Sequence, residues 1–94
     1  MVVRFIKDNM NYGTVGDLVE LNDGSLYYIG DICKVKMGNR NVADCMVVLP
    51  EWNKHPILMG IGELGFNEEI ISVIPYTNLN VGDKHRDCLI ITNE

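Results

Sequence analysis

The fold class follows from one stretch of 21 residues, which reads Val15-Gly-Asp-Leu-Val-Glu-Leu21, Asn22-Asp-Gly24 and Ser25-Leu-Tyr-Tyr-Ile-Gly-Asp-Ile-Cys-Lys-Val35. Two runs rich in β-branched and aromatic residues flank a turn whose residues tolerate a positive φ. This pattern predicts a β-hairpin with strands over residues 17–21 and 26–36. The Gly-Asp pair at 30–31 interrupts the second arm and predicts a bulge or bend through which one strand serves two sheets.

A short triplet recurs along the chain. It reads Val-Gly-Asp at residues 15–17, Ile-Gly-Asp at 29–31 and Val-Gly-Asp at 81–83, and an apolar run follows it each time. Glycine supplies unusual backbone angles and aspartate favours turns, so the triplet indicates a turn at the start of a strand.

Further strands are expected over residues 2–6, 43–49, 57–61 and 88–92. The unbroken apolar run at 47–49 predicts either burial on both faces of its strand or a strand that switches sides. Residues 50–56 form a loop bracketed by prolines. Residues 70–74 are ambiguous, because their β-branched side chains favour a strand while Asn67-Glu68-Glu69 would start a helix well.

Composition narrows the class of protein. The chain has 94 residues, 47% of them hydrophobic, and we expect one domain over residues 1–94. A net charge of −5 with only eight Lys and Arg disfavours direct nucleic-acid binding. An odd number of cysteines, three, predicts a reducing compartment. The sequence holds no apolar run of transmembrane length, so we expect a cytoplasmic protein without membrane contact.

These strands and turns predict a mostly β fold, a small barrel or barrel-like sandwich of about five to seven short antiparallel strands with at most one short helix near 67–74. The stretch 15–48, followed by Asn67-Glu-Glu-Ile-Ile-Ser-Val-Ile-Pro75, resembles SH3-like small barrels over about half of the chain. Arg4-Phe-Ile-Lys-Asp8 together with residues 15–21 is similar to small proteins of bacteriophages and mobile elements. The resemblance implies an SH3-like barrel that binds proteins through aromatic loop residues.

Sequence patterns for catalysis and cofactors are weak. Gly60-Ile-Gly-Glu-Leu-Gly65 matches a dinucleotide fingerprint, but Pro75 ends any following helix too early, and Glu63 would repel a phosphate. His85 and Cys88 have the spacing of zinc ligands without the second close pair that a structural site needs. We therefore expect no enzymatic activity, no cofactor and no metal.

Exposed aromatic and acidic residues are the better candidates. The leading hypothesis is a non-enzymatic protein-interaction module, such as a phage-type inhibitor, that binds a host or phage protein through an acidic face and aromatic loop residues. Its candidate binding residues are Trp52, Tyr76, Glu51, Glu63, Glu68 and Glu69.

Two alternatives stay open. One is a small-molecule or nucleotide sensor in which the backbone amides of residues 60–65 hold an anionic ligand. The other is a virion structural component that assembles as a homo-oligomer through edge strands, including residues 88–92.

Overall fold

The computed structural model describes residues 1–39 and 41–93 and contains short β-strands joined by tight turns. In chain order these are β1 (Val2–Phe5), β2 (Asn11–Thr14), β3 (Leu18–Glu20), β4 (Leu26–Tyr28), β5 (Ile32–Met37), β6 (Asn41–Val48), β7 (Ile57–Leu58), β8 (Glu68–Ile74), the 3-10 turn η1 (Tyr76–Asn78), β9 (Lys84–His85) and β10 (Cys88–Ile91).

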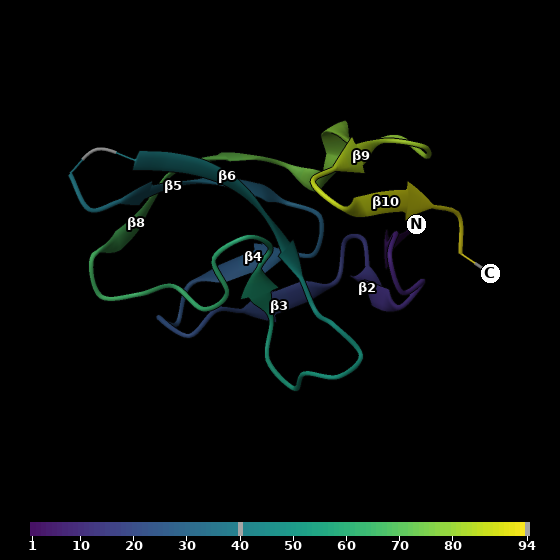
Figure 1. Cartoon of the computed structure of the whole chain (residues 1–94), viewed down its shortest axis with the longest axis horizontal. Coiled ribbons are helices and arrows are strands. Elements are labelled where there is room, and N and C mark those ends of the chain that lie inside the picture. Colours follow the sequence, from purple (N-terminus) through teal and green to yellow (C-terminus); the bar gives the residue numbers. More distant parts are fainter. Residues whose placement is uncertain (40, 94) are drawn as a thin grey trace.

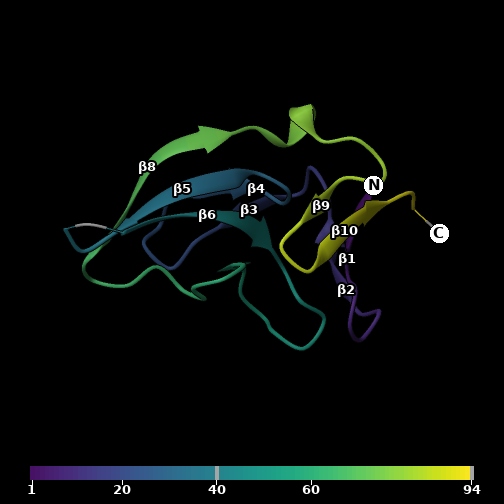
Figure 2. The same ribbon diagram turned by 45° about the horizontal axis from the view of Figure 1, so that its top comes forward.

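The strands pair antiparallel in three sheets, ordered β2-β1-β10-β9, β3-β4 and β7-β6-β5-β8. The chain is elongated, with extents of 40 × 24 × 24 Å. In Figure 1 the sheet that contains β10 lies at one end of the long axis, and β5, β6 and β8 extend toward the other. Figure 2 shows β3 and β4 beside β5 and β6, with β8 on the outside.

A mostly β fold is confirmed, while the expected count of about five to seven strands is wrong, because the described residues form ten. Three strands account for the difference: Gly30, at positive φ, divides the expected strand 26–36 into β4 and β5, and β2 and β9 form in segments where no strand was expected. The strand pairings among the described residues do not close into one ring.

The ambiguous segment is a strand. Residues 68–74 form β8, which pairs with β5, and no helix forms near 67–74; the 3-10 turn η1 comes later. Pairing with β5 satisfies the backbone groups and places Ile70 against Val35, so tertiary contacts override the helix-start signal of Asn67.

The recurring triplet has one structure at all three positions. The glycines Gly16, Gly30 and Gly82 have φ values of +96°, +99° and +95°. At each site the glycine N–H donates to the carbonyl of a residue on the facing segment, and that residue's N–H donates back to the carbonyl of the aspartate. This is a glycine β-bulge, and it bends the strand that it begins. The sequence prediction of a turn at a strand start is confirmed.

Asp31 of the central bulge is the one buried charged side chain among the described residues. Its carboxylate accepts the N–H of Tyr28 at 3.0 Å and the N–H of Tyr76 at 2.8 Å, and its backbone carbonyl accepts the N–H of Val47 at 2.8 Å. Asp31 therefore joins the end of β4, the start of η1 and β6 at one point.

Strand β6 lies between the two hydrophobic cores. Met46 and Val48 pack in one cluster with residues of β1 and β10, whereas Cys45 and Val47 pack in the other with residues of β5 and β7. All four side chains are fully buried, so the predicted burial of this strand on both faces is confirmed. The described part of the chain has no helix of the length and apolarity that crossing a membrane requires.

Candidate protein-binding surface

The predicted anchor Trp52 lies in the loop between β6 and β7, and its side chain is 60% exposed. Its ring meets the buried ring of Tyr12 edge-on, with centroids 6.5 Å apart. The loop is held by a hydrogen bond from the N–H of Asn53 to the carbonyl of Pro50, and Glu51 beside Trp52 is exposed. Trp52 thus rests one edge on the core and presents the remainder to solvent.

The second predicted anchor, Tyr76, does not share a surface with Trp52. Tyr76 is half-buried in η1, where its ring packs on that of Tyr28 with centroids 5.3 Å apart. The turn 76–78 and the loop 50–56 lie on opposite sides of the molecule in both views (Figures 1 and 2). The two aromatic anchors therefore cannot act as one patch.

The remaining predicted carboxylates are also dispersed. Glu68 and Glu69 begin β8, where the Glu68 carboxylate accepts the N–H of Gly65 and so holds a turn of its own chain. Glu69 faces Lys36 across the sheet. Glu63 lines a cleft on another part of the molecule. The six predicted residues are not one surface.

A surface that the sequence reasoning did not select lies on the β3–β4 hairpin. Leu18 stands opposite Tyr28, and Glu20 opposite Leu26, on the face that points away from the core. Leu18, Leu26 and Tyr28 are 57%, 59% and 42% exposed. Side chains alternate along a strand, so Leu18 and Glu20 share a face and one of the consecutive Tyr27 and Tyr28 points outward.

The same hairpin is acidic. Asp17, Glu20 and Asp23 are exposed, and residues 15–33 contain no Lys or Arg. The Ser25 hydroxyl and N–H donate to the carboxylate of Asp23 and hold its pKa below the ordinary value, so this turn stays negatively charged. The outer face of the hairpin therefore combines apolar side chains with Glu20, while Asp17 and Asp23 lie at the two ends of β3.

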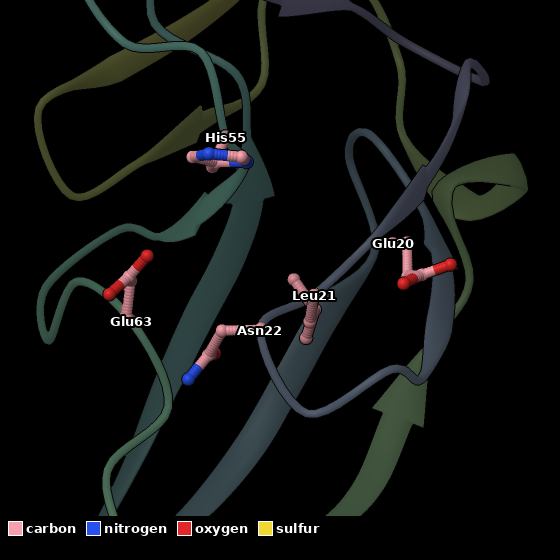
Figure 3. A pocket seen from close by; sticks show the side chains of 5 residues that line it. All are labelled: Glu20, Leu21, Asn22, His55 and Glu63. Atoms are coloured by element: carbon pink, nitrogen blue, oxygen red, sulfur yellow. The ribbon is translucent and has the colours of Figure 1, made fainter.

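A cleft of about 330 Å³ adjoins the hairpin and is lined by Glu20, Leu21, Asn22, His55 and Glu63. Figure 3 shows Leu21 and Asn22 between Glu20 on one side and His55 and Glu63 on the other. The side-chain NH2 of Asn22 donates to the carbonyl of Leu64 at 2.8 Å, and the side-chain oxygen of Asn22 accepts the N–H of Leu64 at 3.0 Å. These two bonds tie the hairpin side of the cleft to the segment that carries Glu63. Two of the five lining residues, Glu20 and Glu63, are acidic, so the cleft suits a cationic group better than an anion.

Four of the six backbone amides in the glycine segment 60–65 already donate within the chain. The N–H groups of Ile61 and Gly62 donate to the carbonyl of Leu58, and those of Leu64 and Gly65 donate to side chains of the chain itself. The segment is followed by strand β8, so it also lacks the helix N-terminus on which a pyrophosphate would rest.

The cysteines are core residues. Cys33, Cys45 and Cys88 are fully buried and free, and Cys33 faces Cys45 across β5 and β6. Burial raises the pKa of Cys33 to about 12 and that of Cys88 to about 11, so both remain protonated thiols at neutral pH. Within residues 1–39 and 41–93, no three metal-ligating side chains come together.

His85, the other half of the zinc-like spacing, contacts protein rather than a ligand site. Its Nε2 lies 3.3 Å from the carbonyl oxygen of Asp44, to which Arg86 Nε also donates at 3.2 Å. Burial lowers the pKa of His85 below its ordinary value. No protein-family model, curated protein or solved structure matches this chain, so the geometry of its surfaces carries the functional reasoning.

Proposed function

We propose that this chain is a non-enzymatic protein-binding module that takes up a basic, partly apolar segment of another protein on the outer face of the β3–β4 hairpin. The observation that carries the proposal is the coincidence, on one hairpin, of Leu18, Leu26 and Tyr28 exposed side by side with carboxylates and no basic residue. Contiguous exposed apolar residues rimmed by charge are typical of protein-interaction sites.

The hairpin is held rigid before any partner arrives. The Gly16 and Gly30 bulges tie its strand ends to neighbouring segments, and Asn22 ties its turn to Leu64. Tyr76 packs against Tyr28 at the margin of the exposed face. Such preorganisation lowers the entropic cost of binding.

The acidic cleft beside the hairpin gives the proposed partner a chemistry. Glu20 belongs both to the outer face and to the cleft, where Glu63 and His55 also lie. A lysine or arginine side chain of the partner would enter the cleft while neighbouring apolar side chains cover Leu18 and Leu26. Charge complementarity of this kind favours association rate and specificity.

We also propose the SH3-like barrel fold and the phage-type inhibitor role that the resemblance implies. An SH3-like barrel is favoured by the bent strand formed by β4 and β5, which serves two sheets across Gly30. This chain would act as a phage-type inhibitor if the basic segment that it binds lines the functional cleft of a host protein. Three free cysteines favour a cytoplasmic site of action.

The proposal is tested with a synthetic peptide of alternating lysine and leucine residues, and with a control peptide in which glutamate replaces each lysine. We expect the basic peptide alone to bind in fluorescence anisotropy, with an affinity that falls as salt is added. Amide NMR shifts should map its contact to β3, β4 and the cleft.

Matched variants locate the site. Leu26→Ser and Glu20→Gln should each weaken peptide binding about fivefold or more, since truncation of a contact in a binding hot spot costs over about 1 kcal/mol. Val81→Ser removes an equally exposed apolar side chain elsewhere and should leave the affinity unchanged. Equal binding by all three variants, or NMR shifts confined to the Trp52 loop, would overturn the assignment.

A further inference from the structure

Strand β8 (Glu68–Ile74) is an open edge. It is the outermost strand of the β7-β6-β5-β8 sheet and, among residues 1–39 and 41–93, pairs only with β5, so alternate backbone N–H and C=O groups point away from the sheet. The outer strands β7 and β9, by comparison, have two residues each. Ile71, Val73 and Ile74 of β8 are 49%, 40% and 47% exposed.

The edge lacks two of the usual protections. No lysine and no proline interrupts Glu68-Glu-Ile-Ile-Ser-Val-Ile74, although natural edge strands commonly carry one or the other. The edge does carry a third device that can protect a strand, a bulge, which places Ile71 between the residues that pair with Lys34 and Val35 and leaves Ile71 without a partner in β5. A long apolar edge of this kind is a template for another strand.

We propose that a second copy of this chain covers the edge, with the two β8 strands antiparallel about a two-fold axis at Ile71. Ile71 is the midpoint of β8, three residues from Glu68 and three from Ile74. The proposal concerns a different surface from the β3–β4 hairpin and does not depend on the binding function proposed above.

Charge selects the antiparallel arrangement. About an axis at Ile71, the Ile71 side chains of the two copies meet, Glu69 faces Val73, and Glu68 faces Ile74 of the other copy. No carboxylate then faces a carboxylate. A parallel, in-register pair would instead set Glu68 and Glu69 against their own copies, and like charges directly opposite one another destabilise a sheet.

The turn before β8 presents a large exposed side chain next to the proposed interface. Phe66 is fully exposed on a turn closed by the hydrogen bond from the N–H of Glu68 to the carbonyl of Gly65. Phe66 therefore places an exposed aromatic side chain beside the N-terminal end of β8, five residues before the proposed axis at Ile71.

The proposed pairing stops at two copies. An isologous pairing uses the β8 edge of both copies, and the opposite edge of the sheet is β7, which has two residues and follows Pro56. Growth beyond two copies therefore lacks a second long edge. The earlier expectation of assembly through residues 88–92 is wrong in its choice of strand, because β10 lies between β1 and β9.

Sedimentation equilibrium and light scattering test the proposal on the full chain. We expect a mass twice that of the 10.6 kDa chain, with a population that rises with concentration and with added salt, since each copy carries a net charge of −5. Ile71→Lys and Ile71→Glu should each give monomers, and an equimolar mixture of the two should restore the dimer. Val81→Lys, equally exposed but away from β8, should stay dimeric.

Cross-linking keeps the test independent of charge. Opposed residues of an antiparallel pair have Cα atoms about 4.5–5.5 Å apart, within the range of a disulfide. Ile71→Cys should therefore form a covalent dimer on mild oxidation, whereas Val81→Cys should not, and the three buried native thiols give no background. Phe66→Ser should raise the dimer dissociation constant about fivefold while the fold, monitored by circular dichroism, is unchanged.

Three results of these experiments would contradict the proposed dimer. A monomeric wild-type chain at about millimolar concentration, higher oligomers without a dimer, or equal cross-linking of the two cysteine variants would overturn the proposal. Peptide binding by monomeric Ile71→Lys should match that of the wild type, so loss of the dimer and loss of the hairpin site are told apart.

Discussion

The bulge at Gly30 provides the sharpest test of how this sequence specifies its fold. Gly30 and Gly82 occupy the same position of the same bulge motif, with φ of +99° and +95°. They differ in their surroundings. A Cβ added at Gly30 would lie 3.0 Å from Leu79 Cδ1 and 3.1 Å from both Tyr76 Cβ and Val15 Cγ1, whereas a Cβ at Gly82 would meet nothing within 4 Å.

Replacement by alanine therefore separates two costs. In both Gly30→Ala and Gly82→Ala, an L-residue is forced into left-handed backbone space at about 1–2 kcal/mol. Only Gly30→Ala adds overpacking, at about 1–3 kcal/mol, because Tyr76 is tied to Asp31 by its N–H and cannot easily withdraw. We expect Gly30→Ala to lose about 2–5 kcal/mol and Gly82→Ala about 1–2 kcal/mol.

Urea unfolding followed by far-ultraviolet circular dichroism measures the difference. With a slope of about 1 kcal/mol per molar urea, the midpoint of Gly30→Ala should lie about 1–3 M below that of Gly82→Ala. The change in unfolded-chain entropy is the same for both variants and cancels. Equal midpoints would refute the assigned packing around Gly30, and a stabilised Gly82→Ala would refute the left-handed backbone itself.

Three further predictions follow from the core. Asp31→Ala should lower the free energy of unfolding by about 2–4 kcal/mol, since two amides lose a charged acceptor. Asp83→Ala frees one exposed amide and should lower it by under about 1 kcal/mol in the same urea assay. The thiols of Cys33, Cys45 and Cys88 should not react with an aromatic disulfide reagent at pH 8 in the native protein, and all three should react in concentrated urea; labelling of the native protein would contradict their burial. Because the folded protein raises the thiol pKa values of Cys33 to about 12 and Cys88 to about 11 from an ordinary 9.0, the unfolded chain releases protons first, and stability should fall as pH rises above about 9. Urea midpoints that stay constant from pH 8 to pH 10 in a buffered series would contradict this linkage.

Local chemistry accounts for the elements that the sequence predicted correctly. Asn22-Asp-Gly24 closes the hairpin with Gly24 at φ +88°, and the three Gly-Asp triplets all form the same bulge. These features depend on backbone angles and hydrogen bonds between residues close in the chain or directly across a turn. Burial of β6 on both faces was likewise readable from its unbroken apolar run.

The candidate site was harder to predict because it depends on distant segments. Trp52 and Tyr76 were joined in one hypothesis by residue type alone, and the fold sends their loops to opposite sides. Alternation groups Leu18 with Glu20 on one face of its strand and requires one of Tyr27 and Tyr28 to point outward, but it does not mark that face as a binding surface. Their exposure follows from which face of β3–β4 meets β5 and β6, and hydrophobic alternation does not determine that face uniquely.

The sequence by itself determined that this protein is built of short strands, where its turns lie and which residues bend the chain, because those preferences are set by each residue and its near neighbours. Only the tertiary structure decided that residues 68–74 are a strand, that this strand is an open edge while β10 is covered, and that Phe66 stands uncovered beside it. Strand order and exposure arise from pairing between segments far apart in the chain, and the free energy of that pairing is shared among many contacts that no local pattern records.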